Sequence, residues 1–335
     1  MALRWGIMGT SKSCNDFANS LNYLPRSEHL IMGVASGRKE EAIEFARKHN
    51  IPNAFENYGD LAKDKSIDVV YIGSSNKSHF ILARLVLYNK KHLLCEPPLC
   101  IKYKDTEELL ALAKKNKLFF MEGVWSRFFP AYNELSQLLA SETIGDVIYL
   151  NADLGVPTSC IDKINHKELE EGTVFDYGVY VLQLALLIFG RNPLTLSAEG
   201  DLNENGMDEN IIYILKYENG KRAILCTHSQ IKMDNSAVVY GSKGHIKLKD
   251  PFWAPTVISM NNGPETRFPL PAVENEKYFM NSQGLVYEAI EVRDCIMKGL
   301  LESPKMTHED TLTIAKWQEC ICKSTGSQAI FQLED

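Results

Sequence analysis

The chain has 335 residues, with 36 Lys and Arg against 43 Asp and Glu, which gives a formal net charge of −7. Hydrophobic residues make up 45% and charged residues 24%, a composition that excludes disordered and fibrous classes. At about 100–200 residues per domain, the length predicts two domains. Since nucleic acid binding needs a basic surface, the acidic balance argues against a nucleic acid partner.

The sequence also lacks the usual signals of membranes, secretion and metals. The longest apolar run, residues 179–189, is much shorter than the roughly 20 residues that span a bilayer. The N-terminus has no apolar signal-peptide core. The 8 cysteines are scattered without a zinc spacing or a disulfide framework. We therefore expect a cytoplasmic protein that binds neither a membrane nor a metal.

The first third alternates between short apolar runs and longer segments with helical periodicity. Such alternation predicts βαβ units around a parallel sheet. Strand signals cover residues 3–8, 30–35, 69–72, 92–95 and 118–121. Helix signals cover residues 15–24, 39–49, 78–88 and 105–115. These elements place the first domain at residues 1–122.

After residue 122 the pattern changes to strands in succession. Several strand-like runs between residues 194 and 260 are separated by short turn signals, which predicts a largely antiparallel sheet. A long apolar helix is expected at residues 175–189, and two helices close the chain at 288–297 and 308–322. The sequence thus predicts an α+β domain over residues 123–335.

The first strand runs into a turn that resembles a dinucleotide-binding motif. Such a motif needs small residues where the backbone approaches the pyrophosphate, at the N-terminus of the next helix. The usual G-x-G-x-x-G/A is altered here to Gly9-x-Ser11-x-x-Cys14, and the Cβ of Ser11 narrows the space for phosphate. Its place in a βαβ series favours a Rossmann domain, with cofactor contacts from Gly9, Thr10, Ser11 and Lys12. The alternative is an ordinary strand-to-helix turn.

The second strand ends in the sequence Ser36-Gly37-Arg38-Lys39. NAD sites usually place a carboxylate here for the ribose hydroxyls, and this position has none. The planar guanidinium of Arg38 can instead pair with a 2′-phosphate, which favours NADP. The alternative is a solvated helix start at which Glu40 and Glu41 partly cancel the charge of Arg38.

The chain resembles a known family in seven segments. They are residues 93–98, 121–130, 172–180, 1–7, 24–29, 241–244 and 300–304. It resembles the glucose–fructose oxidoreductase / inositol dehydrogenase (Gfo/Idh/MocA) family over essentially its whole length. The resemblance implies an NADP-binding Rossmann domain and a second domain whose open sheet pairs two subunits in a homodimer. It also implies a catalytic Glu-Lys-Pro triplet and a helix bearing D-x-G-x-H/Y.

Asp176 and Tyr180 match that helix motif, and their spacing would put both side chains on one helix face. Oxidation of an alcohol needs a base for the hydroxyl proton, and the family match assigns this role to Tyr180, with Asp176 orienting the substrate. A tyrosine with a pKa near 10 needs a nearby cation or donor to act near neutral pH. The alternative is a tyrosine that caps an apolar core helix.

The triplet departs from the family at its central residue, because this chain has Glu96-Pro97-Pro98. Proline carries no exchangeable proton, and loss of a general acid or base typically costs about 10²–10⁴ in rate. Glu96 and Pro97 are still expected beside the cofactor. His79, at the start of the helix after the third strand, is a candidate replacement because its reference pKa is near 6.5. Its alternative is a histidine that faces solvent or packs on the cofactor.

Trp125 and Phe128 are expected to line the substrate pocket, where aromatic rings can stack on a sugar or a cyclic diol. The alternative is that Trp125 and Phe128 pack in the core between the domains and do not contact a substrate. The leading interpretation is an NADP-dependent oxidoreductase for a cyclic diol or sugar hydroxyl, of the trans-dihydrodiol or D-xylose type. Its partner would be a small polyol, sugar or diol. The competing interpretation is a catalytically impaired NADP(H)-binding homologue, because the family lysine is Pro97.

Overall fold

The computed structural model describes residues 2–157, 172–273 and 277–326, and the chain divides into two compact units. The first unit contains Met1–Cys100, Lys104–Phe128 and Leu270–Thr311. The second contains Ile101–Tyr103, Phe129–Pro269 and Leu312–Asp335. The order of the predicted elements gave no sign that Leu270–Thr311 returns to the first unit.

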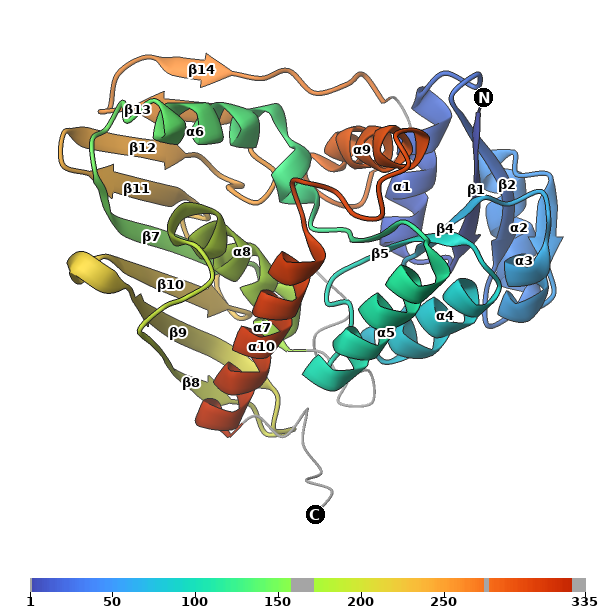
Figure 1. Cartoon of the computed structure of the whole chain (residues 1–335), viewed down its shortest axis with the longest axis horizontal. Helices are drawn as coiled ribbons and strands as arrows, with labels where there is room; N and C mark the ends of the chain where they lie inside the picture. The colour runs from blue at the N-terminus through green and yellow to red at the C-terminus, as the bar shows by residue number, and fades with distance from the viewer. Residues whose placement is uncertain (1, 158–171, 274–276, 327–335) are drawn as a thin grey trace. The chain divides into compact units, whose positions relative to one another are not determined.

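The first unit is built on a six-stranded parallel sheet in the order β3-β2-β1-β4-β5-β6 (Figure 1). This order is that of a doubly wound dinucleotide-binding fold, so the predicted Rossmann architecture is confirmed. All four residues of the central strand β4 are buried, as expected for a strand covered on both faces. The strands are β1 (Leu3–Met8), β2 (His29–Ala35), β3 (Asn53–Phe55), β4 (Val69–Ile72), β5 (His92–Cys95) and β6 (Phe120–Glu122).

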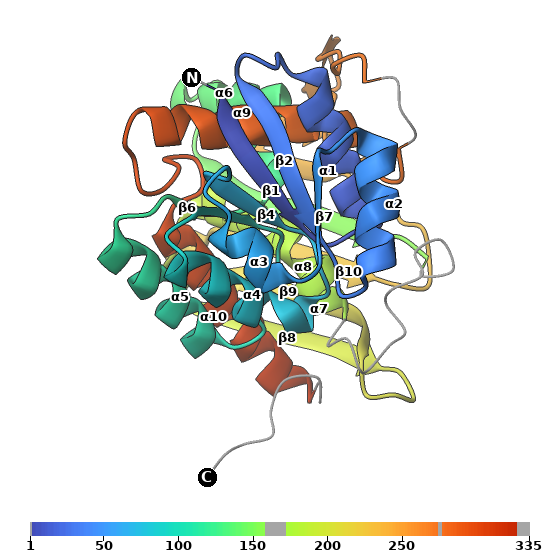
Figure 2. The same ribbon diagram turned by 90° about the vertical axis from the view of Figure 1, so that its right-hand side faces the viewer.

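Helices cover both faces of this sheet, with α1 and α2 on one face and α3, α4 and α5 on the other (Figure 2). Neither β3 nor α3 was predicted from the sequence, because β3 has only 3 residues and α3 only 6. Helix α9 (Leu285–Met297), from the late segment of this unit, packs on α1. The other helices are α1 (Lys12–Tyr23), α2 (Lys39–His49), α3 (Tyr58–Lys63), α4 (Asn76–Tyr88), α5 (Tyr103–Asn116), and the 3₁₀ turns η1 (Trp125–Phe128) and η5 (Ser282–Gly284).

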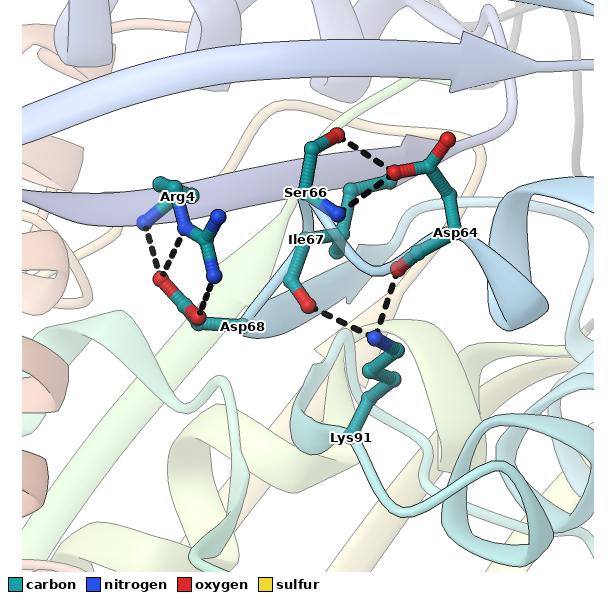
Figure 3. A network of polar contacts seen from close by, with 6 residues as sticks. All are labelled: Arg4, Asp64, Ser66, Ile67, Asp68 and Lys91. Atoms are coloured by element: carbon teal, nitrogen blue, oxygen red, sulfur yellow. Dashed lines mark hydrogen bonds and ion pairs between the residues drawn. The ribbon is translucent and has the colours of Figure 1, made fainter.

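The amino ends of the central strands are held by a polar network (Figure 3). Arg4 in β1 binds Asp68, which precedes β4, through its backbone N (3.0 Å), its Nε (2.9 Å) and its Nη2 (2.6 Å). Lys91 Nζ donates to the carbonyl oxygens of Asp64 (2.6 Å) and Ile67 (2.8 Å). These contacts join the start of β1 to the segments that precede β4 and β5. They lie at the edge of the sheet opposite the dinucleotide turn.

The second unit contains an eight-stranded sheet in the order β14-β13-β12-β11-β7-β10-β9-β8. Only the β7–β10 pair is parallel among the described strands, so the predicted largely antiparallel sheet is confirmed. The strands are β7 (Val147–Gly155), β8 (Thr195–Leu202), β9 (Asp208–Lys216), β10 (Arg222–His228), β11 (Ala237–Gly241), β12 (Gly244–Leu248), β13 (Val257–Met260) and β14 (Glu265–Arg267).

Helices pack on one face of this sheet. Helices α7 (Thr173–Asp176) and α8 (Gly178–Phe189) contact β9 and β10, and α6 (Pro130–Ala140) contacts β13. The last helix is α10 (His308–Thr325), and η4 (Glu218–Gly220) joins β9 to β10. No helix in the described part of the chain is both long and apolar enough to cross a bilayer.

The predicted single helix over residues 175–189 is wrong, because the structure divides it at Tyr177. This residue has φ −110° and ψ −37° and separates α7 from α8. Its hydroxyl donates to the carbonyl of Val156 at 3.0 Å. Helix α8 then begins at Gly178, where a Cβ would lie only 3.0 Å from the hydroxyl of Tyr213 on β9. The break thus lets the start of α8 approach the sheet closely.

We expect Asp68→Asn to lower the free energy of unfolding by about 1 kcal/mol, because it removes the charge from a partly exposed but bidentate ion pair. The carboxylate of Asp68 is 32% exposed, so water screens part of the interaction. Urea unfolding followed by circular dichroism measures the change. Glu108→Gln is the matched control, since the Arg84–Glu108 pair is 3.7 Å long and half exposed on both sides. An equal effect of the two variants would contradict this account.

Candidate dinucleotide-binding and catalytic site

The turn after β1 lies tightly against the carboxyl end of β4. Gly9 has a φ of +119°, and a Cβ there would lie 2.7 Å from the carbonyl oxygen of Gly73. Ser11 caps α1 by accepting a hydrogen bond from Cys14 N at 3.1 Å, and its Oγ also donates to Gly73 O at 2.7 Å. The altered motif is therefore folded as a close-packed turn at a helix N-terminus. This geometry suits the phosphates of a dinucleotide, because the first-turn N–H groups and the helix dipole favour an anion.

The predicted cofactor residue Arg38 has a carboxylate partner at the start of α2. Its guanidinium forms a short ion pair with Glu41, and its side chain is 76% exposed. Glu41 also accepts a hydrogen bond from Ser36 Oγ at 2.7 Å and lies 3.5 Å from Thr10 Oγ1. These hydrogen bonds, first from Ser36 and then from Arg38, hold the pKa of Glu41 below its ordinary value. The structure thus places a negative charge beside the cation expected to bind a 2′-phosphate.

A cavity of about 300 Å³ opens beside this turn within the first unit. Two lysines approach the ring of Tyr278 there, with Lys12 Nζ 5.9 Å and Lys48 Nζ 5.6 Å from its centroid. Asp16 holds this segment by accepting the backbone N–H groups of Tyr278 and Phe279. The lining contains Thr10, Ser11, Lys12, Asn15, Glu41, Glu44, Phe45, Lys48 and Tyr278. The cavity at the start of α1 is thus lined by Thr10, Ser11 and Lys12, which were predicted to contact the cofactor, together with residues that were not.

At the carboxyl end of β5, Glu96 joins the dinucleotide turn to the position of the missing lysine. Its Oε2 accepts a hydrogen bond from Ser13 Oγ at 3.0 Å, and its Oε1 accepts a short one from the hydroxyl of Tyr71. Ser13 Oγ in turn lies 2.8 Å from Ser11 Oγ. Pro97 follows directly and is half-buried, with a cis peptide bond to Pro98. Glu96 and Pro97 therefore lie at the edge of the sheet where this fold binds its ligands.

His79 braces this same turn. It is buried, and its two ring nitrogens lie 2.8 Å from Pro98 O (Nδ1) and 3.1 Å from Ser74 O (Nε2). Glu122, the last residue of β6, holds the next residue of the turn by accepting the N–H of Leu99 at 3.0 Å. This arrangement gives His79 a positioning role, while its catalytic role stays a prediction.

Two buried carboxyl groups stand behind this edge. Glu122 is 5% exposed and Glu288, on α9, is 1% exposed. Burial raises the pKa of Glu122 to about 7. Burial and then the charge of Glu96 raise the pKa of Glu288 to about 8. Glu288 Oε1 faces Gly123, where a Cβ would lie 3.1 Å away, and it has no hydrogen-bond partner among the described residues.

Asp176 and Tyr180 belong to the second unit and lie on either side of the break at Tyr177. Asp176 is the last residue of α7 and Tyr180 lies in the first turn of α8, and both are half-buried. The start of α7 is held by Asp208, which accepts hydrogen bonds from Thr173 Oγ1 and Val174 N, both at 2.7 Å. The roles predicted for Asp176 and Tyr180 stay predictions.

Trp125 and Phe128 form the 3₁₀ turn η1 of the first unit. Trp125 is 8% exposed and Phe128 is 2% exposed, and η1 packs against α9. The ring centroid of Phe128 lies 6.0 Å from Lys305 Nζ. Their predicted place in a substrate pocket stays a prediction.

The sequence analysis missed Ser13, Tyr71, Asp208 and Glu288 because each acts through residues far away in the chain. Ser13 contacts Glu96, which lies 83 residues later, and no local pattern marks that pairing. Glu288 sits in an amphipathic helix as an ordinary acidic residue, and only burial makes it unusual. Among the described residues, no group of three or more His, Cys, Asp or Glu side chains could hold a metal ion.

The fold and this edge of the sheet define a dinucleotide-binding unit followed by an α+β unit. Residues 3–124 match the oxidoreductase family with an NAD-binding Rossmann fold, and residues 132–247 match the GFO/IDH/MocA C-terminal domain. The chain therefore belongs to the GFO/IDH/MocA oxidoreductase family. The family and the oxidoreductase class predicted from the sequence are confirmed.

Curated relatives extend this likeness over nearly the whole chain. The trans-1,2-dihydrobenzene-1,2-diol dehydrogenase of Xenopus laevis is 40% identical over 316 residues, covering 94% of this chain and 96% of the relative. The human protein of the same name is 35% identical over 327 residues, covering 97% and 98%.

Solved structures share the fold at lower identity. An aldose–aldose oxidoreductase from Caulobacter crescentus complexed with glycerol has a TM-score of 0.82 at 20% identity, covering 97% of this chain and 98% of that one. A 3-ketoreductase from Actinomadura kijaniata in complex with NADP and TDP-benzene has a TM-score of 0.81 at 20% identity, with the same coverage.

We expect Glu288→Gln to make the protein more stable than the wild type at alkaline pH. The wild-type Glu288 has a pKa of about 8 when folded. In the unfolded chain its pKa is near the ordinary value of a glutamate. Between these two pKa values the carboxyl group is therefore protonated in the native state and ionised in the unfolded state. Stability is then lost as the pH rises through this window, by at most about 1.4 kcal/mol per pH unit.

Denaturant unfolding at several pH values between 5 and 9 (about the titration window) tests this expectation. The difference in the free energy of unfolding between Glu288→Gln and the wild type should grow with pH. Glu107→Gln is the control, because Glu107 is exposed on α5. A difference that does not change with pH would contradict a buried, protonated Glu288.

Proposed function

We propose that this protein is a dehydrogenase that oxidises a hydroxyl of a cyclic diol or a sugar, of the trans-dihydrodiol or D-xylose type, with NADP as the hydride acceptor. The observation that carries the proposal is the close-packed turn from Gly9 to Lys12, joined through Ser13 and Glu96 to the end of β5. The dihydrodiol dehydrogenases similar to this chain support the substrate class. The ketoreductase crystallised with NADP and the guanidinium of Arg38 support the cofactor.

The residues at the turn fit a dinucleotide. The contact of Gly9 with Gly73 leaves no room for a side chain, and α1 begins directly afterwards at Lys12. When bound, the nicotinamide accepts the hydride from the carbinol carbon. Lys12 and the first turn of α1 would hold the phosphates, and the Glu96–Pro97 turn would lie beside the ring.

The hydroxyl proton must go to a base of this chain as the C=O bond forms. Tyr180 is proposed for this step, with Asp176 orienting the substrate, because both match the family motif and both remain half-buried rather than fully enclosed. Pro97 cannot take part, since it has no titratable atom. His79 and Glu122 would support the step indirectly by holding the Pro97–Leu99 turn.

Pro97 also favours a second candidate, a homologue that binds NADP(H) without efficient turnover. We expect the wild type to form NADPH with at least one of D-xylose, other aldoses or a trans-dihydrodiol. The rate should be within about tenfold of that of Pro97→Lys, because loss of an unreplaced acid or base costs more than that. Absorbance of NADPH measures both rates, and Pro97→Gln controls for the loss of the proline ring.

Further outcomes test the two candidates. Tyr180→Phe should lower kcat by about 10²-fold or more while NADPH binding, followed by fluorescence, stays unchanged. Activity in Pro97→Lys alone would favour the binding homologue. Failure of the wild type to bind either nicotinamide dinucleotide would overturn both candidates.

We also propose that the protein forms a homodimer through the open face of the second sheet. The face away from α7 and α8 carries accessible apolar side chains among polar ones, with Ile212 48% and Tyr240 42% exposed. They lie on β9 and β11, and the four neighbouring strands from β11 to β9 add half-buried apolar side chains on the same face. An exposed apolar sheet face of this kind is typical of a protein–protein interface. These additional side chains are Tyr149, Ile214, Ile224 and Val238.

We expect Ile212→Glu to convert the dimer to a monomer, because it replaces an accessible apolar side chain of the pairing face with a charge. Sedimentation velocity measures the mass. Ile81→Glu is the control, since Ile81 is 68% exposed on α4 of the first unit, and it should remain dimeric. A monomeric wild type would contradict the proposed pairing.

A further inference from the structure

We propose that Glu41 sets the dinucleotide specificity of this protein by weakening its preference for NADP over NAD. The inference rests on the proposed function, because it concerns the same cofactor site. The choice between NADP and NAD then depends on this carboxylate of α2 as well as on the residues at the end of β2.

Glu41 is surrounded by donors from two turns, the one after β1 and the one after β2. Ser36, which follows β2, donates to Glu41 Oε2 at 2.7 Å, and Thr10, in the turn after β1, lies 3.5 Å from the same oxygen. Arg38, which caps the start of α2, forms an ion pair with Oε1. The carboxylate therefore occupies the centre of the polar groups that surround the end of β2.

These same donors are the ones that a 2′-phosphate would need. A guanidinium pairs well with a phosphate monoester beside the ribose, and hydroxyl groups can donate to its oxygens as well. With Glu41 among them, a 2′-phosphate must displace the carboxylate or meet its negative charge. The 2′-hydroxyl of NAD meets no such conflict, because it can donate a hydrogen bond to the carboxylate.

The other cation at this helix start does not relieve the conflict. Lys39 Nζ binds Glu56 at 3.1 Å, so both basic residues at the beginning of α2 have carboxylate partners. Glu44 adds another carboxylate to the lining of the neighbouring cavity. The low pKa of Glu41, caused by its hydrogen bonds from Ser36 and Arg38, keeps this carboxylate ionised at neutral pH.

Fluorescence titration of the purified full-length protein with NADPH and with NADH tests the proposal without any substrate. We expect the wild-type dissociation constants to differ by less than about tenfold. Glu41→Gln should tighten NADPH binding by about tenfold or more, because it removes a like charge from the 2′-phosphate. NADH binding should stay equal or weaken slightly in the same variant.

Two further variants make the result specific. Glu44→Gln removes a charge from the same helix and cavity without touching Ser36 or Arg38, and it should change the NADPH/NADH ratio by less than about threefold. Arg38→Gln should weaken NADPH binding more in the Glu41→Gln background than in the wild type, because Glu41 no longer holds the guanidinium.

The outcomes separate this inference from the proposed function. An NADPH/NADH ratio that Glu41→Gln leaves unchanged would overturn the role of Glu41 while the dehydrogenase proposal stands. A strong wild-type preference for NADPH, beyond about a hundredfold, would do the same. Binding of neither dinucleotide by the wild type would overturn both.

Discussion

The candidate site depends on one close approach, between the turn after β1 and the carbonyl group of Gly73 at the end of β4. That carbonyl accepts hydrogen bonds from Ser11 Oγ at 2.7 Å and from Cys14 Sγ at 3.1 Å. Gly9 allows the approach because it has no Cβ, and Gly73 allows it because a Cβ there would lie 2.7 Å from Cys14 Sγ. The side chains of Ser11 and Cys14 thus fill the space beside Gly73 and form hydrogen bonds to its carbonyl group, which hold α1 against the sheet.

From this approach a chain of polar contacts reaches the position at which the family lysine is absent. Ser11, Ser13 and Glu96 follow one another at hydrogen-bond distance, and Tyr71 completes the set from β4. Behind them Glu288 keeps its proton near neutral pH, because burial and then the charge of Glu96 raise its pKa to about 8. Loss of the lysine therefore leaves an ordered, acidic end of β5 rather than a disrupted one.

The sequence was sufficient for the architecture, because strand and helix periodicity depend on neighbouring residues. It also placed Gly9 after the first strand, Arg38 at the start of α2 and Glu96 at the end of β5, while the roles of these residues stay predictions. It failed where contacts join distant segments, as for the hydrogen bond from Ser13 to Glu96. It also failed at Tyr177, because an apolar helical period does not reveal a break that tertiary contacts produce. Burial of Glu288 could not be predicted either, since a single acid in a helix usually faces water.

The return of Leu270–Thr311 to the first unit has a consequence for synthesis of the chain. Asp16 near the N-terminus binds the backbone of Tyr278 and Phe279, and α9 lies along α1. The nascent N-terminal segment therefore leaves the ribosome with one side of α1 uncovered. It must wait for about half of the chain or more to be translated before its last helix arrives. The second unit's strands are made within that interval, but its core also needs the residues of α10 from Leu312 onwards, so both units are completed only by the C-terminal helices.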